Sequence, residues 1–186
     1  LDTHISTVYA KAIQSLLILG EPGSGKSTIL LDLTRELLQR SLAPGSIEPV
    51  PVVFTLSAWN WYEGKDVETL EGWLIQEMSR LYDMPSHICQ DFLDHNEIGL
   101  MLDGLDEVAE NRRDACVNAI NHFRIIHATP IVVCCRSAEY DALNTHLKLE
   151  EAVELQALTI KQIAEYVGSL PKFTIDKIAT AFNLDE

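Results

Sequence analysis

An apolar run of strand length, SLLIL at residues 15–19, leads directly into the glycine-rich stretch GEPGSGKST at residues 20–28. Leucines then recur at Leu30, Leu33 and Leu37, a spacing typical of one face of a helix. The stretch matches the pattern G-x-x-x-x-G-K-[ST], and strand, loop and helix follow in the order that this pattern requires. The segment therefore predicts a phosphate-binding loop (P-loop) that follows a strand buried in a parallel sheet.

The residue types in this loop fit polyphosphate chemistry. Glycines let backbone N–H groups turn inward, and the following helix directs its positive N-terminal end at the phosphates. We expect Lys26 to reach the β- and γ-phosphates and the Ser27 hydroxyl to ligate Mg²⁺. The residues predicted to bind the nucleotide are Gly20, Glu21, Pro22, Gly23, Ser24, Gly25, Lys26, Ser27 and Thr28. The alternative is a glycine- and serine-rich turn that only opens a helix.

A second signal is the stretch LMLDGLDEV at residues 100–108, in which an apolar run ends in Asp103. An apolar strand followed by a carboxylate is the Walker B pattern. The carboxyl ends of parallel strands meet at one edge of a sheet, where the P-loop also lies. Asp103 is therefore predicted to face Mg²⁺, commonly through a water molecule. The alternative is an acidic surface turn without a bound ion.

In many additional-strand P-loop ATPases, a glutamate directly after the Walker B aspartate polarises the attacking water. Here that position is Gly104, which cannot do so. Asp106 and Glu107 lie beyond the strand end and could reach the γ-phosphate side if the loop curls back. We expect at least one of these two acids to position the water, with Glu107 favoured over Asp106. The other acid would cap the next helix or pair with a base.

The rest of the chain alternates strand-length apolar runs with stretches of helical period, which predicts an α/β fold with a parallel sheet. Further strands are expected at residues 50–56, 98–103, 130–135 and 152–156. From about Thr159 the pattern is helical only. We therefore expect a nucleotide-binding domain at residues 1–158 and the truncated beginning of a helical subdomain at residues 159–186. Because Leu1 is not an initiator methionine, we expect the chain to be a piece of a longer protein.

The composition argues against several kinds of partner. The 186 residues include 28 acids and 14 bases, and the net charge is −14, so we expect no binding to nucleic acid or anionic lipid. No apolar stretch approaches the roughly 18 residues that a membrane-spanning helix needs. The four cysteines lack metal-ligand spacing, and buried, reduced thiols in a cytoplasmic protein are the expected reading.

With GEPGSGKST and LMLDGLDEV both in place, the chain resembles the NACHT NTPases, a branch of the signal-transduction ATPases with numerous domains (STAND class). That family has a small residue directly after the Walker B aspartate and further acids shortly downstream, which DGLDE at residues 103–107 fits closely. IVVCCRSAEY at residues 131–140 resembles the family's fourth strand, and Arg136 stands where the family has its sensor arginine. LSAW at residues 56–59 and WL at residues 73–74 resemble bacterial members in particular.

The resemblance implies a P-loop NTPase fold with a five-stranded parallel sheet in the order 5-1-4-3-2, flanked by helices. It also implies a slow ATPase that binds ATP or ADP with Mg²⁺ and acts as a molecular switch. Nucleotide exchange would open the protein, drive self-association into a homo-oligomer and activate a fused effector domain. A sensor domain outside this segment would supply the input. For bacterial members the implied setting is antiviral defence, a form of innate immunity, or stress signalling.

Arg136 also makes physical sense by itself. A guanidinium at the carboxyl end of the fourth strand could contact the γ-phosphate and distinguish ATP from ADP. The alternative is an ion pair with a nearby acid such as Glu139. Arg112 and Arg113 follow the acids at a helix start and are expected to be solvated, the alternative being a finger that reaches a neighbour's nucleotide.

Two rival functions also use a P-loop. A binding module could hold nucleotide structurally without significant hydrolysis, and Gly104 keeps this alternative open. A small-molecule kinase would need an acceptor site and usually a lid rich in arginine and lysine, which this acidic, base-poor sequence does not show.

Overall fold

The computed structural model describes residues 4–59 and 69–156. Its elements in chain order are α1 (Ile5–Lys11), β1 (Ser15–Gly20), α2 (Lys26–Ser41), β2 (Val50–Thr55), η1 (Leu56–Ala58), α3 (Leu70–Tyr82), α4 (Ser86–Asp94), β3 (Ile98–Asp103), η2 (Leu105–Glu107), α5 (Glu110–Ile126), β4 (Ile131–Cys135), α6 (Ser137–Asp141) and β5 (Glu151–Leu155). Each predicted strand forms, with both ends within one residue of those expected.

The chain divides into two units, residues 1–155 and residues 156–186. Only Gln156 of the second unit is described, so the helical subdomain expected at residues 159–186 lies outside the described residues. Within residues 4–59 and 69–156, no helix is long and apolar enough to cross a membrane.

The five strands form one sheet in the order β2-β3-β4-β1-β5, and each neighbouring pair is parallel. This is the order 5-1-4-3-2 read from the other side, so the predicted α/β fold and strand order are confirmed. Because the strands share one direction, the last residues of β1, β3 and β4 come to the same edge of the sheet. These residues are Gly20, Asp103 and Cys135.

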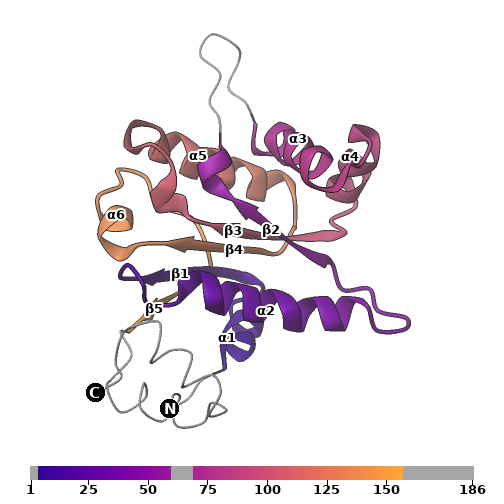
Figure 1. Ribbon diagram of the computed structural model, residues 1–186, viewed down its shortest axis with the longest axis horizontal. Helices are drawn as coiled ribbons and strands as arrows, with labels where there is room; N and C mark the ends of the chain where they lie inside the picture. The colour runs from indigo at the N-terminus through magenta and orange to yellow at the C-terminus, as the bar shows by residue number, and fades with distance from the viewer. Residues whose placement is uncertain (1–3, 60–68, 157–186) are drawn as a thin grey trace, which may run out of the picture. The chain divides into compact units, whose positions relative to one another are not determined.

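Helices cover both faces of this sheet (Figure 1). α3, α4 and α5 lie on one face, and α1 and α2 lie on the other. Alternate residues of a strand serve the two faces. On β4, Val133 and Cys135 join the cluster beneath α3 and α5, whereas Val132 and Cys134 join the cluster beneath α2. The inner strands β1, β3 and β4 are apolar almost throughout because both of their faces are buried, whereas the edge strand β5 carries exposed glutamates. All four cysteines are buried and free.

The short helices α1, α4 and α6 have no counterpart among the elements expected from the sequence. α1 has seven residues and α4 has nine. α1 places Tyr9 in the cluster beneath α2, and α4 buries Cys89 and Leu93 on the opposite face. Helices of this length make fewer than three turns, which is too little for apolar periodicity to stand out.

Asp114 on α5 ties this helix to the loop that leads into β5. Its Oδ2 accepts a hydrogen bond from Asn144 Nδ2 at 2.8 Å, and its Oδ1 accepts one from the backbone N–H of Thr145 at 2.8 Å. About two turns further along α5, Asn121 Oδ1 accepts a hydrogen bond from the backbone N–H of Lys148 at 2.8 Å. These bonds fix the course of the chain between α6 and the edge strand.

The amide of Asn144 and the N–H of Thr145 lower the pKa of Asp114 below its ordinary value. A carboxyl with a lowered folded-state pKa stabilises the fold above its unfolded pKa, and this contribution is lost as the pH falls through the folded pKa. We expect Asp114→Asn to lower the melting temperature at neutral pH, and the difference from wild type to shrink below about pH 4. Circular-dichroism melting curves from neutral to acidic pH check this.

The matched control is Asp141→Asn, an exposed acid on α6, which should change the melting temperature little at any pH. A difference between Asp114→Asn and wild type that stays constant down to strongly acidic pH would contradict this account of Asp114.

Candidate functional site

The glycines of the loop between β1 and α2 are required by its geometry. Gly23 and Gly25 have φ angles of 75° and 92°, in the left-handed region that favours glycine. Gly20 is required for a different reason, since a Cβ there would lie 2.6 Å from Ser24 Oγ and 3.0 Å from the carbonyl oxygen of Leu155 on β5. Any other residue at position 20 would collide with the loop or with the edge strand.

Polar groups of this loop converge at the beginning of α2. The first N–H groups of a helix have no partner within the helix, and Gly25 at the N-cap has no side chain to satisfy them. Lys26 Nζ donates to the carbonyl oxygens of Gly20 at 2.8 Å and Glu21 at 2.9 Å. The Ser24 hydroxyl is buried and has no hydrogen-bond partner among the described residues. Unsatisfied donors and a lysine at a helix N-terminus suit an anionic ligand.

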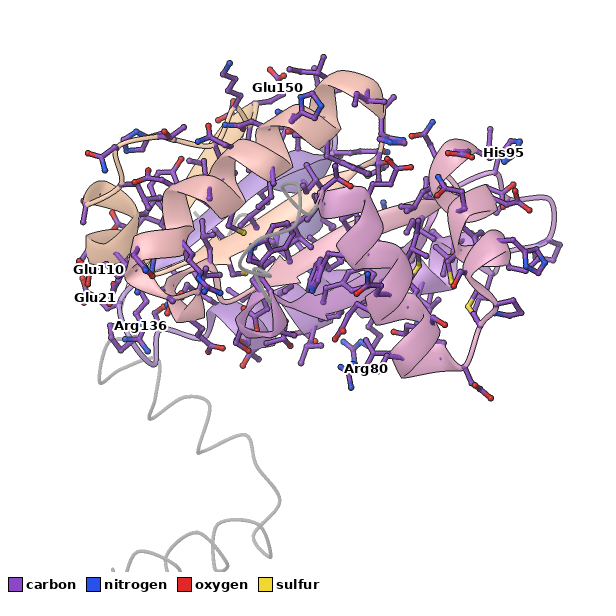
Figure 2. The ribbon with its side chains drawn as sticks, turned by 90° about the horizontal axis from the view of Figure 1, so that it is seen from above. Glu21, Arg80, His95, Glu110, Arg136 and Glu150 are labelled. Atoms are coloured by element: carbon purple, nitrogen blue, oxygen red, sulfur yellow. The ribbon has the colours of Figure 1, made fainter. Side chains whose placement is uncertain are left out.

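The other residues predicted to bind nucleotide lie on the same loop or in the first turn of α2. Those that are exposed are Glu21, Pro22, Gly23, Ser27 and Thr28. Figure 2 shows Glu21 at the same edge of the fold as Arg136, which follows β4, and Glu110, which begins α5. His95, in the loop before β3, lies at the opposite edge. The P-loop and the carboxyl ends of the inner strands therefore share one edge.

Asp103 ends β3 at this edge, and β4 lies between β3 and β1. The pKa of Cys134 on β4 is affected by charged residues that end or follow its two neighbouring strands. Burial raises the pKa of its thiol, the Asp103 carboxylate raises the pKa further, and the Lys26 ammonium lowers it. The Lys26 and Asp103 charges thus act on the same buried thiol, in keeping with the place of β4 between β1 and β3.

Beyond Asp103 the chain turns back on itself through η2. The N–H of Glu107 donates to the carbonyl oxygen of Gly104 at 3.0 Å, and Gly104 has a φ angle of 77°. A Cβ at Gly104 would lie 3.0 Å from Glu107 Cδ and 3.1 Å from Glu107 Oε2. The Glu107 carboxyl group therefore folds over Gly104 and comes close to the strand end.

Asp106 binds Arg136. Asp106 Oδ2 lies 2.8 Å from Arg136 Nε, and Oδ1 accepts a hydrogen bond from the backbone N–H of Arg136 at 3.2 Å. The Asp106 side chain is 7% exposed and that of Arg136 is 42% exposed. Arg136 Nη1 also lies 3.5 Å from Glu139 Oε1. The ion pair considered as an alternative for Arg136 is thus present, and its shorter contact is with Asp106 rather than with Glu139.

The expectation that Arg113 is solvated is wrong. Its Nε donates to the carbonyl oxygen of Val108 at 2.9 Å, and its Nη2 donates to that of Asp106 at 2.7 Å. Arg113 therefore fastens the acidic turn to the first turns of α5. Sequence reasoning missed this role because both acceptors are backbone carbonyls, and no residue type in the sequence marks them.

These groups form one assembly at the carboxyl edge: a P-loop, a Walker B aspartate, a second acidic pair and an arginine. The sequence matches the family model of the NACHT domain over residues 14–171. The chain belongs to the NACHT family. NACHT domains are P-loop NTPases, and the matched span includes every residue of the candidate site. No curated protein matches this NACHT domain.

The contact between Gly104 and Glu107 can be tested by adding a methyl group. Gly104→Ala would place a left-handed alanine with its Cβ 3.0 Å from Glu107 Cδ. We expect it to destabilise the NACHT domain by more than the roughly 1–2 kcal/mol that a left-handed non-glycine residue costs. Urea unfolding measures this loss.

Gly45→Ala is the matched control, because Gly45 has a φ angle of 79° and no described atom lies within 4 Å of the added Cβ. Gly45→Ala should lower the free energy of unfolding only by the cost of a left-handed alanine backbone. Equal losses for the two variants would contradict the expected extra cost, because they would show that the Glu107 side chain yields to the added methyl group.

Proposed function

We propose that this NACHT domain binds ATP together with Mg²⁺ and hydrolyses it slowly, as a nucleotide-controlled switch. The observation that carries the proposal is the convergence of the P-loop, Asp103, the acidic turn and Arg136 at one sheet edge. ADP would hold a closed state, and exchange for ATP would open it and drive self-association into a homo-oligomer that activates a fused effector. By family resemblance, the setting we propose is cytoplasmic signalling in bacterial antiviral defence or stress response.

The residues present fit a nucleotide and its metal ion. In this proposal the N–H groups of the P-loop hold the phosphates, and Lys26 exchanges two loop carbonyls for phosphate oxygens. Ser27 and Asp103 would hold Mg²⁺, which offsets phosphate charge when bound. Between residues 4–59 and 69–156, no group of three or more His, Cys, Asp and Glu side chains is arranged to hold a metal. Phosphate oxygens and water would complete the coordination, as Mg²⁺ prefers.

We further propose different roles for the two acids. Both carboxylate oxygens of Asp106 are engaged by Arg136, and the side chain is buried, so Asp106 is suited to positioning Arg136 against the γ-phosphate. Glu107 is exposed and folds back over Gly104. Its carboxylate would accept a hydrogen bond from a water that attacks the γ-phosphorus. The bond from that phosphorus to the bridging oxygen then breaks, which releases ADP and inorganic phosphate.

Lys26→Ala tests the binding site. Loss of a charged hydrogen-bond donor to the phosphates should weaken ATP binding by about tenfold to a hundredfold or more, which calorimetry with ATP and Mg²⁺ would measure. Lys11→Ala, an exposed lysine at the end of α1, is the control and should leave the affinity unchanged. Tight ATP binding by a folded Lys26→Ala variant would contradict the site.

Two further variants separate the roles of the acids. Glu107→Gln should lower the rate of phosphate release by about a hundredfold or more while ATP still binds, since it removes the group that positions water. Asp106→Asn should instead weaken the preference for ATP over ADP, because Arg136 loses its charged partner. Phosphate-release kinetics and the two nucleotide affinities distinguish these outcomes.

If neither variant changed a measurable rate, the domain would be a nucleotide-binding module without hydrolysis. If Asp106→Asn alone abolished turnover, and its affinities for ATP and ADP still differed as in the wild type, the roles of the two acids would be exchanged. Asp106 would then position the water. Phosphate transfer to a small acceptor, rather than release of inorganic phosphate, would favour a kinase.

A further inference from the structure

A cavity lies on the side of the sheet that α3 and α5 cover, away from the candidate nucleotide site. It has a volume of about 320 Å³ and is lined by the first turn of α3 and by α5 from Ala115 onward. Apolar side chains make up most of its wall, among them Leu70, Ala119 and Phe123. No residue of the P-loop, the acidic turn or the Arg136 contact lines it. Its size is that of a small-molecule pocket.

One wall of this cavity carries a buried polar atom. His127, directly after α5, has a side chain that is 8% exposed, and its ring stacks on Phe123 with a centroid distance of 4.2 Å and an interplanar angle of 18°. His127 Nε2 is buried and makes no hydrogen bond to any described residue. Because this nitrogen is fully buried, a molecule in the cavity cannot reach it, and the charged group that the cavity presents is Glu71.

A carboxylate stands opposite this nitrogen. Glu71 Oε2 lies 3.9 Å from His127 Nε2, too far for a hydrogen bond between them. The other carboxylate oxygen, Glu71 Oε1, accepts a hydrogen bond from Gln90 Nε2 of α4 at 2.6 Å, which fixes its orientation. The cavity therefore offers a cation an oriented carboxylate beside an apolar wall.

We propose that this cavity binds a small organic amine with a compact apolar body. The ammonium group pairs with the Glu71 carboxylate, and the apolar body packs against Leu70, Ala119 and Phe123. The carboxylate selects for a cation and against an anion of the same shape. The net charge of −14 also favours the approach of cations to this chain.

The test compares three probes of one shape in the full chain: 2-phenylethylamine, 2-phenylethanol and phenylacetate. Two-dimensional NMR titrations should give saturable shifts at the His127 ring and the Ala119 methyl group, strongest for the amine and weakest for phenylacetate. Glu71→Gln should weaken amine binding about tenfold and leave 2-phenylethanol nearly unchanged. No saturable shift with the amine, equal binding of phenylacetate, or no effect of Glu71→Gln would overturn the proposal.

Matched variants separate this site from the nucleotide site. Glu97→Gln removes the same charge from an exposed position between α4 and β3 and should leave amine affinity unchanged. Ala119→Phe should fill the cavity and abolish binding of all three probes, and if it does not fold, Glu71→Gln and Glu97→Gln still decide. Lys26→Ala should not alter amine binding, so the amine site and the proposed ATP site succeed or fail independently.

Discussion

The position of β4 between β1 and β3 is the constraint on which the candidate site depends. β4 pairs in parallel register with both neighbours, Leu19 lying opposite Cys135 and Leu102 opposite Val133. Two strand spacings of about 4.8 Å place the P-loop strand and the acidic strand about 10 Å apart. A triphosphate and its hydrated ion can span that distance. The same strand supplies Arg136 at its own end, so three functional groups come from three consecutive strands of the sheet.

The acids at this edge of the sheet differ in whether a basic residue neutralises their charge. Asp106 is balanced by the guanidinium and the N–H of Arg136, and Arg113 holds the backbone of the same turn. Among the described residues, Asp103 and Glu107 have no ion pair. In a chain with a net charge of −14, these are the carboxylates that a bound cation would offset most. In the function proposed for this domain, the acid that already has a partner positions Arg136, and the acids without an ion pair act on the metal ion and the water.

The inner strands were predictable from the sequence because burial between two helical layers makes them apolar on both faces. The P-loop and Asp103 were predictable because their residue types and spacing follow from phosphate chemistry. The pairing of Asp106 with Arg136 was not, since it joins residues 30 positions apart and depends on strand order and on the turn at η2. The sequence offered Glu139 as the nearer partner, although the turn brings Asp106 closer. The fold of Glu107 over Gly104 depends likewise on a backbone angle that the sequence does not display.

The register of the edge strand has a mechanical consequence. β5 pairs only with β1 in the order of the sheet, and its last residue, Leu155, lies opposite Gly20, the first residue of the P-loop. The carbonyl oxygen of Leu155 is so close to Gly20 that even a methyl group there would collide with it. The edge strand therefore borders the root of the P-loop directly, without an intervening element. A slip of β5 by one residue would change the space in which the phosphate loop turns.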